Sequence, residues 1–184
     1  MNEQLRRDIR NYKDGYNEDV RAVALARLSA LVWHFFEVHG ACLDSLGTPV
    51  THVTHVPSGA VSRRSGPHPI EGLLRFAPPH WERFDLTRTA DSTTRTLDPL
   101  SLSVPDINLS GRHVVVFDDT WTTGAKAQSA ALRVRQAGAD LVSIVVAARI
   151  LNVGWGPTAR LLEQYPKIPW RGDVCPVTGG ACPS

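Results

Sequence analysis

The sequence predicts an α/β fold with a parallel central sheet and flanking helices. Two observations carry this prediction: a strand, a helix and a second strand follow one another between residues 114 and 150, and both strands are almost entirely apolar. Strands that are buried on both faces and joined by a helix pair in parallel with a right-handed crossover. A chain of 184 residues is long enough for one such domain with its own core.

Bulk composition is typical of a soluble globular protein. The hydrophobic content is 42%, the charged content is 21% and the net charge is +2, without a concentrated basic stripe. Nucleic acid is therefore not expected as a partner. Residues 1–14 mix both charges without an apolar signal-peptide core, and the longest apolar run, 141–148, is too short to span a bilayer. We therefore expect a cytoplasmic protein without a membrane partner.

Apolar residues recur at helical spacing from Asn17 to His39 and predict an amphipathic helix packed on the core. Asn17 is a suitable amino-terminal cap, and Gly40 follows the last turn. Arg27 interrupts the apolar row, but its stem can lie along the face with its charged head in water. His34 and His39 are expected to be surface or packing residues, because no partner recurs at metal-ligand spacing.

Residues 50–56 are rich in β-branched side chains and predict a strand that stops at a tight loop. The loop residues that suit an anion pocket are Pro57, Ser58, Gly59, Arg63 and Arg64. A solvated basic turn is the alternative interpretation. A short helix is expected from Pro67 through Arg75. The polar stretch 77–112 is long for a connection, and its Arg88 and Arg95 suit a lid over a polyanion.

The clearest pattern joins a strand at 114–117, a polar turn and a helix at 125–137 that Gly138 ends. Ligands of open α/β sheets bind at this edge. The turn surrounds a helix amino terminus, where free N–H groups and the helix dipole hold a phosphate, and Gly124 lets the backbone come close. The adjacent Asp118 and Asp119 can accept hydrogen bonds from sugar hydroxyls. A phosphate beside a diol is the expected ligand.

The segment Val-Val-Val-Phe-Asp-Asp-Thr-Trp-Thr-Thr-Gly-Ala-Lys, which ends at Lys126, resembles the motif of type I phosphoribosyltransferases for 5-phosphoribosyl-1-pyrophosphate (PRPP). It departs from that motif at Thr120, Trp121 and Lys126. The ComF-like branch of this family is also weakly similar to this chain at residues 9–15, at 56–69 and before residue 111. The amino-terminal zinc-binding cysteines of many ComF-like proteins are absent.

The resemblance implies a Rossmann-like single domain over 1–184, with a core at 9–150 and a carboxyl-terminal extension at 151–184. It implies a phosphoribosyltransferase of nucleotide metabolism, and a homodimer, in which a nitrogen nucleophile displaces pyrophosphate from PRPP and Mg²⁺ neutralises the leaving group. Asp118 and Asp119 would hold the ribose hydroxyls as catalytic residues. The phosphate cradle would be Thr122, Thr123, Gly124, Ala125 and Lys126. The pyrophosphate loop would be Pro57, Ser58, Gly59, Arg63 and Arg64. No residue is assigned as a direct metal ligand.

Other functions remain open to different degrees. The departures at Thr120, Trp121 and Lys126 are compatible with a PRPP-binding protein that regulates a partner or serves DNA uptake without catalysis. An ATPase is disfavoured because the chain has no G-x-x-x-x-G-K-[ST] segment. Aspartates that only cap the next helix would leave the Thr-Thr-Gly run unexplained. Trp121, Trp155 or Trp170 could stack on an acceptor base, although each also suits packing.

The cysteines, Cys42, Cys175 and Cys182, are too few and of odd number for a secreted disulfide scaffold. Cys175 and Cys182 lie in a Pro/Gly-rich tail and could form half a metal site. Two thiolates do not complete a tetrahedral zinc shell. We therefore expect unbonded or structural cysteines in a poorly structured tail.

Overall fold

The computed structural model describes residues 3–57, 69–89, 96–151, 154, 158, 159, 163 and 174–183. Within these residues, parallel strands form a central sheet in the order β2-β1-β5-β6. The strands are β1 (Val50–His55), β2 (Glu82–Arg83), β5 (His113–Trp121) and β6 (Leu141–Arg149). The predicted α/β class with a parallel central sheet is confirmed.

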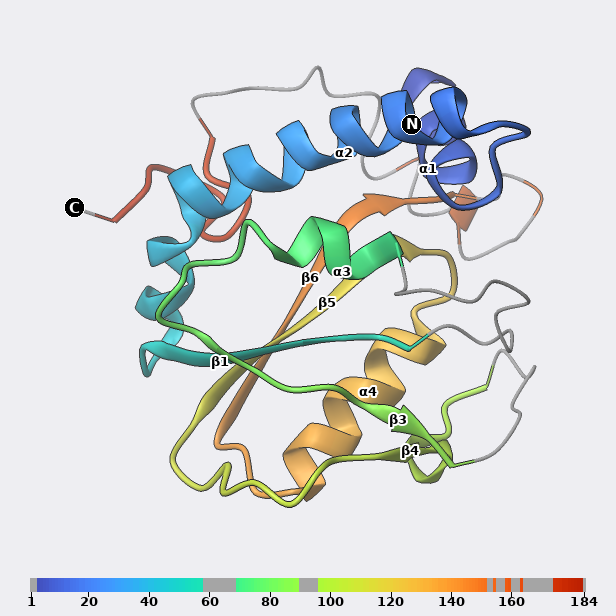
Figure 1. Ribbon diagram of the computed structural model, residues 1–184. Coiled ribbons are helices and arrows are strands. Elements are labelled where there is room, and N and C mark those ends of the chain that lie inside the picture. The colour runs from blue at the N-terminus through green and yellow to red at the C-terminus, as the bar shows by residue number, and fades with distance from the viewer. Residues whose placement is uncertain are drawn as a thin grey trace.

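Helices cover both faces of this sheet (Figure 1). On one face lie α1 (Glu3–Asp14), α2 (Glu18–His39) and α3 (Pro69–Leu74), and on the other lies α4 (Ala125–Gln136). Shorter elements are the 3-10 helices η1 (Ala41–Leu46) and η2 (Pro99–Ser101) and the antiparallel pair β3 (Thr87–Arg88) and β4 (Leu102–Ser103). None of the helices in the described ranges combines the length and apolar character that crossing a bilayer requires.

Strand β5 holds the two layers together because its side chains alternate between two hydrophobic clusters. Val115 and Phe117 pack with the core of α1, α2 and α3, whereas Val114 and Val116 pack with α4. All four side chains are at most 1% exposed. A strand buried on both faces has this continuous apolar sequence, as predicted from residues 114–117.

Strand β5 is longer than the sequence predicted. It continues through Asp118 and Asp119 to Trp121, so the two acids lie inside the strand and do not follow it. The reason is its other neighbour: β1 stops pairing at Phe117, but β6 pairs with β5 as far as Trp121. Because strand side chains alternate, Asp119 lies on the face of α1 and Asp118 on the face of α4.

Helix α1 was not predicted, although its apolar residues carry a helical pattern. Leu5, Ile9 and Tyr12 are spaced by four and three residues, and they pack against the core cluster of α2 and β5. Buried Asp8 of α1 also lies 3.3 Å from the Arg27 guanidinium of α2. The sequence predicted that the Arg27 guanidinium would reach water. It did not predict this ion pair with α1.

Helix α2 provides a direct test of the predicted amphipathic face. Leu28 is 1% exposed in the core, whereas Leu31 is 42% exposed on the same helix. Leu28→Ala should lower the free energy of unfolding by about 2–5 kcal/mol, because it removes buried methyl groups and leaves a cavity. Leu31→Ala is the matched control and should change it by about 0.5 kcal/mol or less. Equal losses in urea denaturation would contradict this packing.

Candidate functional site

A pocket of about 330 Å³ lies at the carboxyl edge of the sheet, where the chain leaves β1 and β5 continues. This volume is at the small end of the usual range for ligand pockets. Its walls include every residue of the predicted ribose and phosphate sites. The lining residues are Ile9, Lys13, Val56, Pro57, Asp118, Asp119, Thr120, Thr122, Thr123, Gly124, Ala125, Lys126 and Ala127.

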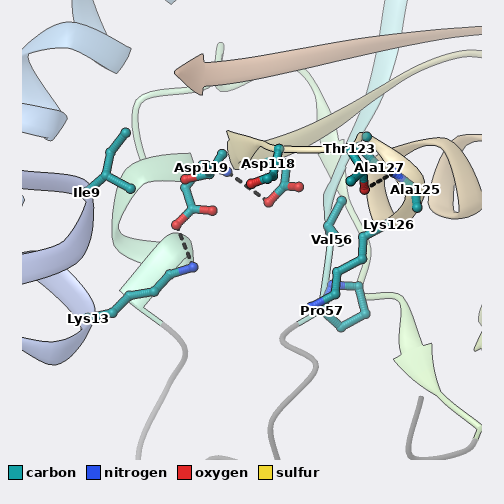
Figure 2. A pocket seen from close by; sticks show the side chains of 13 residues that line it. Ile9, Lys13, Val56, Pro57, Asp118, Asp119, Thr123, Ala125, Lys126 and Ala127 are labelled. Carbon is teal, nitrogen blue, oxygen red and sulfur yellow. Dashed lines mark hydrogen bonds and ion pairs between the residues drawn. The ribbon is translucent and has the colours of Figure 1, made fainter. Parts of the chain in front are cut away.

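The amino terminus of α4 forms one wall of the pocket. Gly124 caps the helix without a side-chain hydrogen bond, and the Ala125 N–H donates to Thr123 Oγ1 at 3.4 Å (Figure 2). The first N–H groups of a helix have no partner within it. This wall therefore offers backbone donors and a positive dipole end, which is the arrangement that binds an anion.

Glycine is required at the start of α4 for two reasons. Gly124 has a φ of 80°, in the left-handed region that other residues rarely adopt. A Cβ at this position would also collide with the Trp121 indole ring. Trp121 is partly buried and packs against the cluster of α4. Its ring thus packs against the turn at Gly124. This is the packing role that the sequence offered for Trp121 as an alternative to stacking on a base.

Two cationic side chains lie on the same side of the pocket. Lys126 extends toward Val56 and Pro57 (Figure 2), and it shares a smaller adjoining hollow with Arg88. Burial and the positive charge of Arg88 lower the pKa of Lys126. Two neighbouring cations repel each other, and an anion bound between them would relieve this repulsion.

The opposite wall contains a buried carboxylate that α1 holds in place. Lys13 Nζ lies 2.5 Å from Asp119 Oδ2 (Figure 2), and the Tyr12 hydroxyl donates a hydrogen bond to the same oxygen. Burial is the largest single influence on Asp119 and would raise its pKa, but the charge of Lys13 and the hydrogen bonds from Lys13 and Tyr12 act together to lower the pKa. Burial, followed by the Asp119 charge, raises the pKa of Tyr12, so its hydroxyl stays a donor.

Asp118 behaves differently from its neighbour. Burial, followed by the negative charge of Asp119, raises the pKa of Asp118 to about 7. Its Oδ1 accepts a hydrogen bond from the Asp119 N–H at 2.9 Å. The pair therefore carries a single negative charge over much of the acidic pH range, because Asp119 is ionised while Asp118 is protonated. At neutral pH Asp118 can therefore donate a hydrogen bond as well as accept one.

Other predicted residues have different outcomes. Pro57 lines the pocket, and Arg88 lies beside it. The remaining predicted positions lie outside the described residues, and their roles stay predictions: Ser58, Gly59, Arg63, Arg64, Arg95, Trp155 and Trp170.

Sequence reasoning missed Tyr12 and Lys13 as site residues. Both belong to the segment 9–15, which was recognised only for its weak family likeness. Tyr12 lies 107 positions from Asp119 in the sequence, so no local pattern links them. The helical spacing of Ile9 and Tyr12 was the available signal, because it predicts that this face of α1 turns toward the sheet.

Comparison with solved structures finds phosphoribosyltransferases. A hypoxanthine phosphoribosyltransferase from Staphylococcus aureus matches with a TM-score of 0.42 and 13% identity, over 66% of this chain and 62% of that one. A hypoxanthine-guanine-xanthine phosphoribosyltransferase matches with a TM-score of 0.42 and 17% identity, over 66% and 64%. A phosphoribosyltransferase from Corynebacterium diphtheriae matches with a TM-score of 0.40 and 19% identity, over 74% and 89%.

The aligned part of this chain thus spans less than two thirds of the first two proteins. No family model matches the chain, and no curated protein matches its sequence. The ComF-like branch therefore stays a prediction.

The contact between Lys13 and Asp119 can be tested by a double-mutant cycle. Lys13→Met should lower the free energy of unfolding by about 1–3 kcal/mol, because it leaves the Asp119 charge buried without its cation. Asp119→Asn in the Lys13→Met background should restore part of this loss. Arg10→Met, at an exposed position of the same helix, is the control. A Lys13→Met protein as stable as this control would contradict the contact.

Proposed function

We propose that this chain binds PRPP in the pocket between α1, β5 and α4, and that it acts as a phosphoribosyltransferase. The observation that carries the proposal is the division of charge across one pocket. An open helix terminus with Lys126 forms one wall, and the pair Asp118 and Asp119 forms the other. A ligand that is anionic at one end and rich in hydroxyl groups at the other complements both walls.

The 5-phosphate would lie against the start of α4. The N–H groups of the first turn would donate to its oxygens, the Thr122 and Thr123 hydroxyls would add side-chain donors, and Lys126 would add charge. The phosphate would then place a negative charge beside Lys126, whose neighbour Arg88 is also a cation. This assignment gives a function to Gly124, because a side chain there would displace the Trp121 ring that supports the turn.

The ribose hydroxyls would lie against the acids. Asp118 would accept or donate a hydrogen bond according to its protonation, and Asp119 would act from the position that Lys13 and Tyr12 fix. Asp118 and Asp119 offer the hard oxygen ligands that Mg²⁺ prefers, so the residues present fit this ion. When bound with pyrophosphate, Mg²⁺ would neutralise the charge of the leaving group.

In the transfer itself, a nitrogen nucleophile would form a bond to the anomeric carbon of PRPP as the bond to pyrophosphate breaks. The side chains of the acidic wall would stabilise positive charge that develops on the ribose ring. The acceptor would be a nucleobase or an amine. We further propose that the transfer takes place in a homodimer in the cytoplasm.

A second candidate function is PRPP binding without transfer, in a regulatory or DNA-uptake protein. One observation favours it: Asp119 is already engaged by Lys13 and Tyr12 of its own chain. Pyrophosphate release separates the two functions. The enzyme should release pyrophosphate with at least one of purines, pyrimidines or ammonia, whereas a sensor should bind PRPP and release none.

Calorimetric titration of PRPP with Mg²⁺ tests the site. Lys126→Met should weaken binding by about tenfold or more, because it removes a charge-assisted contact to phosphate. Asp119→Asn should weaken it too. Arg135→Met, which removes the same charge from the exposed end of α4, should bind like wild type. If wild type takes up no PRPP, or if Lys126→Met binds as tightly as Arg135→Met, the proposal is wrong.

A further inference from the structure

Far from the pocket, one histidine and three cysteines form a compact cluster. His39 is the last residue of α2 and Cys42 lies in η1, while Cys175 and Cys182 come from the carboxyl-terminal segment 174–183. Each offers one ligand atom, and these four atoms all lie within 4.8 Å of one another. Figure 1 shows this segment, in red, beside the carboxyl end of α2 and away from α1.

The spacing of the ligand atoms suits a tetrahedral metal ion. His39 Nδ1 lies 3.4 Å from Cys182 Sγ and 4.0 Å from Cys42 Sγ. Ligands on a tetrahedron with zinc–sulfur bonds of about 2.3 Å and zinc–nitrogen bonds of about 2.0 Å lie about 3.5–3.8 Å apart. Small rotations of the side chains would therefore bring all four atoms into a coordination shell.

Both halves of the cluster are built by local structure. His39 and Cys42 are three residues apart at the junction of α2 and η1, which places them on one side of the chain. Cys175 and Cys182 begin and end a turn in which the Cys175 N–H donates to Gly180 O at 2.7 Å and the Gly179 N–H donates to Cys175 O at 2.8 Å. The positive φ of Gly179, 73°, permits this turn.

The cluster is also buried against the protein body. His39, Cys42 and Cys175 are 8%, 3% and 1% exposed, and Cys182 closes the outer side. Val177 within the turn packs against the main hydrophobic core. The tail that the sequence predicted to be poorly structured therefore has an ordered turn at 174–183, and the half site of Cys175 and Cys182 gains two partners from α2 and η1.

We propose that His39, Cys42, Cys175 and Cys182 bind one structural zinc ion that fastens the carboxyl-terminal segment to α2 and η1. Three sulfurs and one imidazole nitrogen are a standard closed zinc shell, and a tetrahedral sulfur-rich site selects zinc over Mg²⁺ or Ca²⁺. All four positions are taken by protein atoms, so the ion has no open position for a substrate. Its role is to close a chain loop between residues 143 positions apart.

Metal analysis of the full chain, purified without chelator, tests this proposal. Wild type should carry about one zinc per chain, and Cys175→Ser, which removes the most buried ligand, should lose it. Cys182→Ser removes the exposed ligand and keeps the three buried ones, so we expect it to retain zinc but to release it at a chelator concentration that leaves wild type loaded. His39→Cys should retain zinc because four cysteines also form a structural site. His34→Ala, an exposed histidine of the same helix, is the control.

Removal of zinc from wild type should also lower its melting temperature, and this shift should be absent in Cys175→Ser. Two results would overturn the proposal. One is wild-type protein without stoichiometric zinc even after refolding with excess zinc. The other is a disulfide between two of the three cysteines in protein kept under reducing conditions. Neither readout depends on PRPP, so the outcome is independent of the proposed function.

Discussion

The contact of Asp119 with Lys13 and Tyr12 is the interaction on which the rest of the site depends. It joins the first helix of the chain to the end of the central strand, and it makes α1 a wall of the pocket. A carboxylate as buried as Asp119 needs a cation and hydrogen-bond donors to remain ionised. Because that negative charge is fixed, burial can keep the neighbouring Asp118 partly protonated near neutral pH.

The geometry of β5 explains how two adjacent acids have such different environments. Strand alternation turns Asp119 toward α1 and Asp118 toward α4. Asp119 pairs with Lys13 and stays charged, while Asp118 lies nearer the start of α4 and Lys126. The charge therefore changes across the pocket. Asp119 is paired with Lys13 at one side, Asp118 is titratable, and Lys126 at the start of α4 is cationic. This surface supports the proposal that the ligand is a sugar phosphate.

Local patterns were sufficient to predict the main elements. The apolar spacing of 17–39, the β-branched segment at 50–56 and the strand, helix and strand of 114–150 predicted α2, β1, β5, α4 and β6. Gly124 in the turn also predicted the start of α4 that lines the pocket, because glycine has a specific function at a helix start. The short strands β2, β3 and β4 have two residues each and leave no periodicity to detect.

Long-range contacts were not predictable from the same patterns. The extension of β5 through the acids depends on pairing with β6, and the role of Lys13 depends on the docking of α1. The histidine and cysteine cluster joins residues 143 positions apart, and each half alone is an incomplete ligand set. In each case the chemistry is visible in the sequence, but only the fold brings the partners together.

Lys13 and Tyr12 divide the acidic pair into one fixed charge, Asp119, and one titratable group, Asp118. Carboxyl-carbon NMR titration of protein labelled at aspartate measures this directly, with Asp118→Asn used to assign the signals. We expect a step for Asp118 with a midpoint pKa of about 7, and for Asp119 a pKa below that of an ordinary aspartate. Two acids that both titrate near the ordinary value of about 4 would contradict it.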